Sequence, residues 1–540
     1  MAGGYISKAI SIDAPIGGWD AFSSMDNMPP TNAIILDNLI PSTGSVITRG
    51  GTAFYANTQT GLPVETVSSL DTATDSLLIS ASDGGIWSTA ETQVLVGGAS
   101  VQAIDTLPLA TAGTFSNSRW QTANFREADF DGVLIMCNGE DDVQLVETPY
   151  NTVADADFTL TEGGAIIQRQ FIGVTNFKGR CFYWDDNSSS FWYTQARSYK
   201  GLIKEFNLGA IAQKGGKLVL ITTWTQQDSG DGKDDFIVFV MSTGEIIVYQ
   251  GDDPETIGFF EMVGRYTTAE PLSIRGASKY GADTILMTTD GYLALSTLIQ
   301  QGRVSEVTAF SQLISTAIQD RTKYGFDFYG WDVALLPTQS LFVFNVPTTN
   351  AMNAYEQHVL NTVTQRWCRF TDITVICLAT HQERLFGGTP DGTIVAISEG
   401  TSDLGDPIKF IALPAFDYLG DQGNHKHITA AQIISTHTNP ELISLTGFAD
   451  FNYKSPPPLD TPFLKGQGIW SIDPASPPQV IGSFWDEDYW SVEDSPFTTK
   501  GWQNCSAFGY AVSVMVRFNK VNEGVIWRST GLRFNQAGAQ

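Results

Sequence analysis

The chain has 540 residues, of which 42% are hydrophobic and only 16% are charged. This composition excludes an intrinsically disordered protein, and the length exceeds what one hydrophobic core accommodates, so we expect two or more domains. The formal net charge of −27 excludes a protein that grips nucleic acid by neutralising phosphates, because that function requires clustered Lys and Arg.

Five cysteines are scattered along the chain without a CxxC pair. This pattern disfavours a metal framework or a disulfide scaffold and favours buried thiols in a reducing cytoplasm. The first ten residues lack the charged region and apolar core of a secretory signal, and no apolar run approaches ~18 residues. We therefore expect a protein that is made in the cytoplasm and has no membrane-spanning segment.

An apolar strand, a glycine-containing turn and a second apolar strand recur along the chain. The pattern occurs at 76–87, 132–145, 179–193, 235–249, 283–295, 340–370 and 384–396. Gly tolerates the positive φ of a tight hairpin, and alternate strand residues supply two faces for packing. Successive turns lie roughly 50 residues apart, close to the ~40–50 residues of a four-stranded propeller blade.

The predicted fold class is all-β, with a six- or seven-bladed β-propeller over 60–400. Residues 401–540 contain proline-rich loops and strand-like stretches at 510–518 and 524–534, which predict a second, β-rich platform domain. Residues 1–59 carry no blade pattern, so we expect them to pack with this C-terminal domain. Apolar residues at helical spacing predict one helix at 311–320. A pair of β-sandwiches is the alternative for the propeller region.

Motifs for nucleotide, zinc-protease or hydrolase chemistry are absent from the sequence. His425 and His427 would share one face of a strand, but no third metal ligand accompanies them, so a solvated strand or loop is favoured. The acidic stretch 228–235 has calcium-like spacing but lacks the bidentate Glu of an EF-hand loop. We therefore predict no catalytic, cofactor-binding or metal-binding residues and no enzymatic activity.

Three groups of motifs follow one another in a distinctive order. The first comprises 14–19, 28–30, 33–41 and 49–51, the second 234–240 and 244–254, and the third Asn361, 367–370 and 386–392, with a closing segment at 527–538. In order and spacing these motifs resemble the tail nozzle, or tail tubular, protein family of short-tailed bacteriophages. None of them is catalytic, so their combination rather than any single motif carries the resemblance.

The resemblance implies a structural virion protein of the viral tail. It implies a homohexameric ring with one propeller per subunit, below a portal-adaptor ring and in contact with tail fibre or tip proteins. The nozzle would retain the genomic double-stranded DNA and then pass it into the host during DNA ejection, without sequence-specific binding.

Acidic turns are the candidates for the lining of such a channel. A duplex that is repelled by a carboxylate-lined wall slides without attractive traps, although the same charge also serves solubility. The candidate residues are Asp228, Asp231, Asp234, Asp235, Asp252 and Asp253.

A glycan-binding or glycan-cleaving propeller that recognises a host receptor is the alternative function. The stretch 82–87 is a near miss of the sialidase Asp box, but its spacing is wrong and it does not recur. Glycoside hydrolysis needs two carboxylates across one cleft, and the sequence alone cannot pair them. Trp485, Trp490 and Trp502 fit either exposed sugar-binding aromatics or core and subunit-interface residues.

Overall fold

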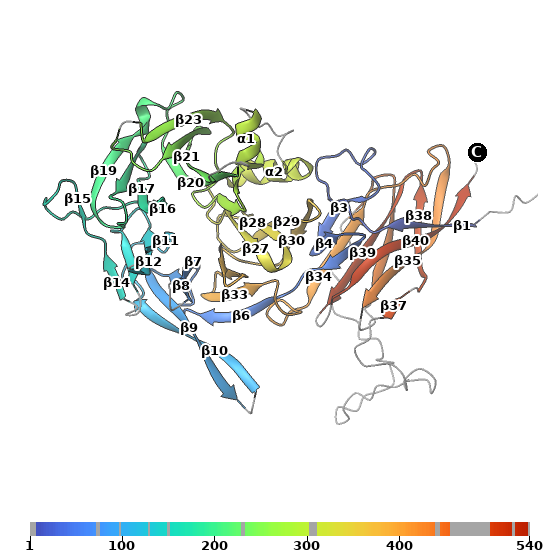
Figure 1. The fold of residues 1–540 in the computed structure, drawn as a ribbon. Coiled ribbons are helices and arrows are strands. Elements are labelled where there is room, and N and C mark those ends of the chain that lie inside the picture. Colours follow the sequence, from blue (N-terminus) through green and yellow to red (C-terminus); the bar gives the residue numbers. More distant parts are fainter. Residues whose placement is uncertain are drawn as a thin grey trace, which may run out of the picture. The chain divides into compact units, whose positions relative to one another are not determined.

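A computed structural model describes most of the chain. The described residues are 7–71, 76–96, 99–127, 130–147, 152–227, 233–256, 258–301, 310–437, 443–453, 497–499, 501–520 and 524–537. Strands dominate them, and the all-β fold class is confirmed (Figure 1). Within these ranges, no helix is both long and apolar enough to cross a membrane. The chain divides into unit 1 (Met1–Ala53, Leu360–Thr371 and Ser398–Gln540) and unit 2 (Phe54–Val359 and Asp372–Ile397).

The first sheet of unit 1 joins the two ends of the chain. Its order is β37-β35-β40-β5-β4, with β1 paired to β40 and β38 paired to β35. The strands are β1 (Ser7–Asp13), β4 (Leu39–Ser42), β5 (Ser45–Thr48), β35 (His425–His437), β37 (Phe497–Thr499), β38 (Gln503–Gly509) and β40 (Ile526–Ala537). The antiparallel pairing of β1 with β40 places Ser7 opposite Asn535.

Within unit 1, the strands of the second sheet have the order β30-β3-β34-β39-β36, with β2 beside β3. The strands are β2 (Gly18–Trp19), β3 (Asn32–Asp37), β30 (Arg366–Phe370), β34 (Ile408–Pro414), β36 (Ser444–Ala449) and β39 (Val512–Lys520). Strands β36 and β39 contact β35 and β38, so the two sheets pack against each other. The rings of Phe410 and Phe518, on paired strands of this sheet, stack with centroids 4.8 Å apart.

Two ion pairs, each with at least one buried partner, join three distant segments of unit 1. Arg49 Nη2 lies 2.7 Å from Asp403 Oδ2, and Arg369 Nε lies 2.8 Å from Asp37 Oδ1. The side chain of Asn38 accepts a hydrogen bond from Arg49 Nε at 2.8 Å. A buried guanidinium is tolerated only when its charge is paired and its N–H groups are bonded. These contacts therefore fix the register of the segments that carry them.

Seven groups of paired strands, here called sheets 1 to 7, follow one another in chain order through the described residues of unit 2 (Figure 1). Sheet 1 comprises β7 (Val64–Asp71), β8 (Ser76–Ser82), β9 (Gly85–Val96) and β10 (Ala99–Ala110). Sheet 2 comprises β11 (Gln121–Glu127), β12 (Phe130–Cys137), β13 (Gln144–Glu147) and β14 (Thr152–Asp155). Sheet 3 comprises β16 (Gly173–Phe177), β17 (Arg180–Trp184), β18 (Ser190–Thr194) and β19 (Gly201–Asn207), with β15 (Phe158–Thr159) beside β19.

The later sheets of unit 2 are built in the same way. Sheet 4 comprises β20 (Leu218–Gln227), β21 (Lys233–Met241), β22 (Glu245–Gly251) and β23 (Phe260–Thr267). Sheet 5 comprises β24 (Ala277–Tyr280), β25 (Asp283–Thr288) and β26 (Gly291–Ala294), and sheet 6 contains β27 (Asp332–Leu336), β28 (Leu341–Pro347) and β29 (Tyr355–Asn361). Sheet 7 comprises β31 (Cys377–His381), β32 (Arg384–Gly388), β33 (Thr393–Ile397) and β6 (Thr52–Asn57).

Contacts between neighbouring sheets form a closed cycle. Strand β7 contacts β11, β11 contacts β16, β16 contacts β20 and β20 contacts β25. Strand β24 then contacts β27, β27 contacts β31, and β31 contacts β7 again. The last sheet is completed by β6, which comes from the start of the unit and pairs with β33.

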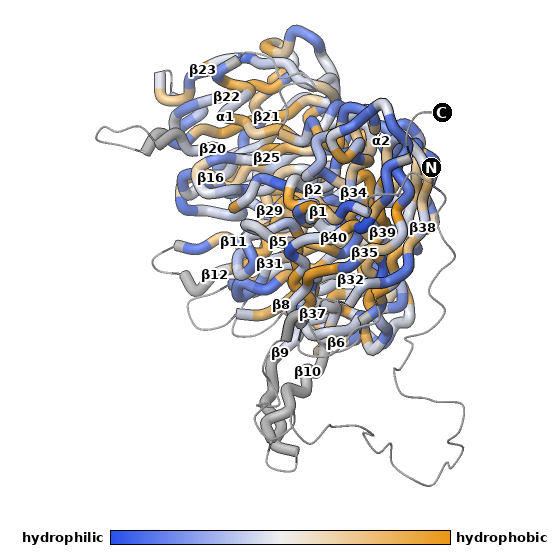
Figure 2. Tube along the Cα trace, turned by 90° about the vertical axis from the view of Figure 1, so that its right-hand side faces the viewer, coloured by the Kyte–Doolittle hydropathy of each residue, from blue (hydrophilic) through white to orange (hydrophobic). Residues whose placement is uncertain are grey.

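Alternate residues of one strand pack against two different neighbouring sheets. On β12, Leu134 and Met136 join a core with sheet 1, whereas Val133, Ile135 and Cys137 join a core with sheet 3. Strand residues alternate between the two faces of a sheet, so a strand buried on both faces is a continuous apolar run. Figure 2 shows such hydrophobic stretches along the strands and hydrophilic stretches in the connections.

The predicted helix at 311–320 starts later than expected. A 3₁₀ turn covers Gln312–Ile314, and α2 extends from Ser315 to Gly325. The hydroxyl of Ser311 accepts a hydrogen bond from the backbone N–H of Tyr292 at 2.8 Å, which holds this residue outside the helix. A second helix, α1 (Leu295–Gln301), follows β26 and was not predicted.

Gly18 and Gly44 allow a controlled test of backbone packing in unit 1. Both have positive φ, but a Cβ on Gly18 would lie 2.7 Å from the carbonyl oxygen of Trp367, whereas a Cβ on Gly44 meets nothing within 4 Å. Each Gly→Ala change adds about 1 kcal/mol of backbone strain. We expect Gly18→Ala to lower the free energy of unfolding by about 2 kcal/mol more than Gly44→Ala, because only Gly18 meets backbone. Denaturant titration measures both, and equal losses would contradict this close approach.

Candidate functional site

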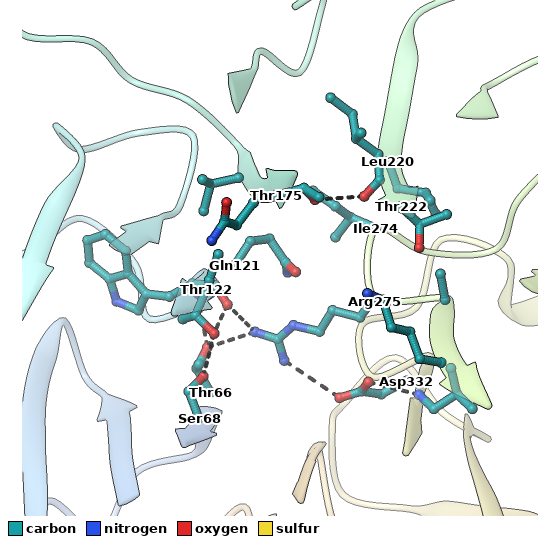
Figure 3. A pocket seen from close by; sticks show the side chains of 18 of the residues that line it. Thr66, Ser68, Gln121, Thr122, Thr175, Leu220, Thr222, Ile274, Arg275 and Asp332 are labelled. Carbon is teal, nitrogen blue, oxygen red and sulfur yellow. Dashed lines mark hydrogen bonds and ion pairs between the residues drawn. The ribbon is translucent and has the colours of Figure 1, made fainter. Parts of the chain in front are cut away.

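A cavity of 410 Å³ lies where the first strands of the seven sheets converge in unit 2 (Figure 3). Every sheet contributes to its wall. The lining includes Thr66 of β7, Thr122 of β11, Thr175 of β16, Thr222 of β20, Ala277 of β24, Val333 of β27 and Leu378 of β31. A single feature of the fold, the convergence of these strands, therefore creates the site.

Side-chain hydroxyls connect successive sheets around this cavity. Thr175 Oγ1 of sheet 3 donates to the carbonyl of Ile221 in sheet 4 at 2.8 Å. The hydroxyls of Ser68 and Thr122 join sheets 1 and 2 at 2.9 Å. Thr284 of sheet 5 donates to the carbonyl of Thr223 in sheet 4, and, farther from the cavity, the exposed Thr380 of sheet 7 donates to the carbonyl of Leu335 in sheet 6. The bonds of Ser68, Thr175 and Thr284 satisfy buried or partly buried polar groups that the ladder of a single sheet leaves unpaired.

Arg275 spans the cavity and joins sheets that are not sequence neighbours (Figure 3). Its guanidinium donates to the carbonyl oxygens of Glu65 and Trp120, at 3.0 and 2.7 Å, and to Thr66 Oγ1 at 2.7 Å. On its other side it lies 4.0 Å from the carboxylate of Asp332 on β27. One side chain thus ties sheets 1, 2 and 6 together.

Burial and pairing act in opposite directions on these two charges. Burial raises the pKa of Asp332, although the Arg275 charge and the backbone N–H groups of Leu378 and Val333 partly offset that effect. Burial by itself lowers the pKa of Arg275, but the interactions with Tyr329, Asp332 and other neighbours outweigh it and leave the pKa raised. The guanidinium therefore stays charged, and Asp332 depends on it for compensation.

A second cavity, of 660 Å³, adjoins the first and shares Gln121 and Ile274 with it. Its lining is more acidic and includes Glu65, Asp83 and Glu140. Arg119 Nε lies 3.1 Å from Glu65 Oε1, and its guanidinium covers the ring of Tyr329 at 4.3 Å. The guanidinium of Arg275 also lies over this ring, 5.6 Å from its centroid, so the Tyr329 ring already contacts two guanidinium groups.

Of the predicted channel-lining aspartates, those that the structure describes do not line either cavity. Asp228 and Asp231 fall outside the described residues, and Asp234 lies in β21, where its side chain is not described. Asp235 is half-buried and accepts a hydrogen bond from Thr225 Oγ1 at 2.7 Å. Their role in a channel stays a prediction.

The second predicted acidic turn follows directly on β22. Strands β21 and β22 pair through Phe236 and Gln250, so this turn lies next to Asp235 at the same end of the hairpin. Asp252 is exposed. Asp253 lies 3.1 Å from Arg180 Nη2, and its pKa is lowered, first by the hydrogen bond from Thr256.

The histidines and tryptophans considered in the sequence analysis form no metal site or sugar-binding cluster within the described ranges. The ring of His425 stacks on Phe508, and His427 Nε2 lies 3.3 Å from Ser506 Oγ. Among the residues that the structure describes, no three or more His, Cys, Asp or Glu side chains form a metal-binding group. Trp485 and Trp490 lie outside those residues, and Trp502 is covered by Arg533 at 4.4 Å.

The sequence interpretation missed the residues that shape the central site. Arg275, Gln121, Asn176 and Lys279 lie in no recognisable motif, and only the fold brings them to one cavity. Thr or Ser occurs in the first strand of every one of these sheets except sheet 6, and this was a local signal that the sequence offered.

No protein-family model matches this chain, and no curated protein matches it. Among solved structures, it is similar to Sqt1 of Saccharomyces cerevisiae, with a TM-score of 0.37, 10% identity, and 68% of this chain and 96% of that chain covered. It is also similar to the computationally designed Ika8 protein, with a TM-score of 0.33, 10% identity, and 64% and 99% covered. Similarities at this level assign no function.

Removing Arg275 should leave Asp332 buried without its compensating charge. We expect Arg275→Met to lower the free energy of unfolding by about 3 kcal/mol at neutral pH. Without the guanidinium the pKa of Asp332 rises further in the folded state, while in the unfolded state it stays near its ordinary value. The folded state then binds the proton more tightly, so the stability of the variant falls as pH rises above about 4.

Denaturant titrations between about pH 4 and pH 8 measure this dependence. The double variant Arg275→Met, Asp332→Asn should lose most of this pH dependence, because the amide that replaces the Asp332 carboxyl does not titrate. Arg119→Met is the matched control, since Arg119 forms a half-exposed pair with Glu65 worth less than about 1 kcal/mol. A pH profile of Arg275→Met parallel to that of the parent chain would contradict this account of the site.

Proposed function

We propose that unit 2 is a seven-bladed β-propeller. The seven successive sheets, the closed cycle of contacts between them and the completion of the last sheet by β6 support this proposal. A propeller protects its sheets by radial repetition, and a terminal strand that completes the last blade fastens the ring.

We propose further that the protein is a tail nozzle subunit of a short-tailed bacteriophage, a structural virion protein without enzymatic activity. The observation that carries this proposal lies in unit 1, where motifs of the resemblance meet although they are distant in sequence. Asn361 Nδ2 donates to the carbonyl of Pro41 at 2.9 Å, and Arg369 pairs with Asp37. The segment 14–19 reaches the same place, because Gly18 approaches the backbone of Trp367.

This convergence supports an interpretation in which the motifs are shared for their architecture and not for their chemistry. Residues that meet in one buried cluster constrain each other through packing and ion pairs, without any catalytic role. The resemblance would then reflect the way in which these segments pack together in unit 1. In the proposed assembly, six subunits form a ring below an adaptor ring, contact fibre or tip proteins, and surround the DNA.

The proposed assembly is tested on isolated tails. We expect electron microscopy to show the protein as a six-fold ring with an opening wider than the duplex, and mass photometry of the released ring to give six chains. A monomer or a two-fold dimer within the tail would refute the nozzle assignment.

The acidic turns provide a second test, in assembled virions. Asp252 is exposed, so Asp252→Lys reverses a charge without breaking the Arg180–Asp253 pair. If the turn lines the channel, the new Lys binds phosphates, slows ejection and makes the slowing weaker at high salt through counterion release. Single-virion ejection at two salt concentrations measures this effect.

Asp327→Lys is the control for this experiment, because Asp327 is exposed and lies outside the acidic turns. Wall charges act on DNA only within about 8 Å at physiological salt. Unchanged ejection with Asp252→Lys at both salt concentrations would place the turn outside the channel, or leave it with a role in solubility alone.

A further inference from the structure

Several polar side chains of the 410 Å³ cavity are not used by the ties between sheets. Asn176 Oδ1 is buried and has no hydrogen-bond partner. Gln121 and Thr222 also line the cavity, and neither side chain makes a hydrogen bond within the described part of the chain. Figure 3 shows the Gln121 amide directed into the open space between the strands. Buried polar groups are nearly always bonded, so the Asn176 oxygen requires a partner. The half-buried side chains of Gln121 and Thr222 can bind the same partner.

The charge of the cavity favours an anionic partner. Arg275 and Asp332 compensate each other, and the guanidinium is committed to three backbone or hydroxyl acceptors. Lys279 of β24 also lines the cavity, is exposed, and forms no ion pair with the residues that the structure describes. One positive charge at the rim is therefore left uncompensated.

The volume sets the size of the partner. A space of 410 Å³ corresponds to about a dozen water molecules at their share of liquid volume. A six-membered sugar acid has about as many non-hydrogen atoms, so a molecule of this size fits the space. Its hydroxyls both donate and accept, as the amides of Gln121 and Asn176 and the hydroxyl of Thr222 require.

We propose that the central cavity of unit 2 is a binding site for a single-ring sugar acid. Lys279 binds the carboxylate, and Gln121, Asn176 and Thr222 bind the ring hydroxyls. The site lies within one subunit, so it does not depend on ring assembly and stands or falls separately from the nozzle proposal.

The full chain is titrated with glucuronate, with glucose, which lacks the carboxylate, and with acetate, which lacks the hydroxyls. Calorimetry measures affinity. Tryptophan fluorescence reports on the site itself, because Trp120 and Trp184 line the cavity. We expect glucuronate to bind saturably, glucose to bind about tenfold more weakly, and acetate not to change the fluorescence.

Variants then assign the contacts. Lys279→Met should reduce the affinity for glucuronate to that for glucose, and Lys323→Met, which removes an exposed lysine of α2, should change neither. Gln121→Leu should weaken both sugars, with thermal unfolding as the check on folding. Lys279→Met removes only a rim charge, so it keeps the test valid if Gln121→Leu fails to fold.

Three results would overturn the proposal. The first is the absence of saturation by glucuronate at about 10 mM, ten times a millimolar dissociation constant, which would mean that the cavity holds water only. The second is equal binding of acetate and glucuronate, which would show a nonspecific anion effect. The third is unchanged binding in both Lys279→Met and Gln121→Leu, which would place the sugar elsewhere.

Discussion

Unit 2 depends on one pairing that joins its beginning to its end. Strand β6 adds to β33, and Thr58 extends this closure by donating both its backbone N–H and its hydroxyl to the carbonyl of Gly392, at 2.9 and 3.0 Å. Closing a chain of this length costs entropy, although the cost grows only slowly with length. Once sheet 7 is fixed beside sheet 1, β31 contacts β7 and every sheet has two neighbours. Sheets that are apolar on both faces need this closure, because an end sheet would expose one apolar face to water.

The same closure creates a centre that apolar packing does not fill. Convergent strands bring backbone carbonyls and hydroxyls to one axis, and an unpaired buried polar group there costs free energy. The ties of Ser68, Thr122 and Thr175 satisfy part of this demand, and Arg275 satisfies three acceptors at once. Asn176 Oδ1 still lacks a hydrogen-bond donor, and the proposed ligand would supply one. Stability and binding at this site therefore have a common physical origin.

In unit 1, ion pairs fix the spatial order of segments that are distant in sequence. Its segments come from the start, the late middle and the end of the chain, so local sequence cannot fix their order in space. The pairs Arg49–Asp403 and Arg369–Asp37 do so, because a buried charge without its partner is far more costly than a misplaced apolar side chain. The five cysteines, all buried and unpaired, add no covalent constraint.

The sequence by itself determined the strands, the turns and the all-β class. Asp83 and Gly84 have positive φ in the predicted turn between β8 and β9, and Gly244 and Gly392 have it in theirs, because local chemistry sets such turns. Only the tertiary structure decided that β30 belongs to unit 1, since an apolar strand pairs with whichever edge the fold offers. It also decided the central site. Arg275 and Asn176 belong to no recognisable sequence motif, and they line one cavity only because the strands that carry or surround them converge.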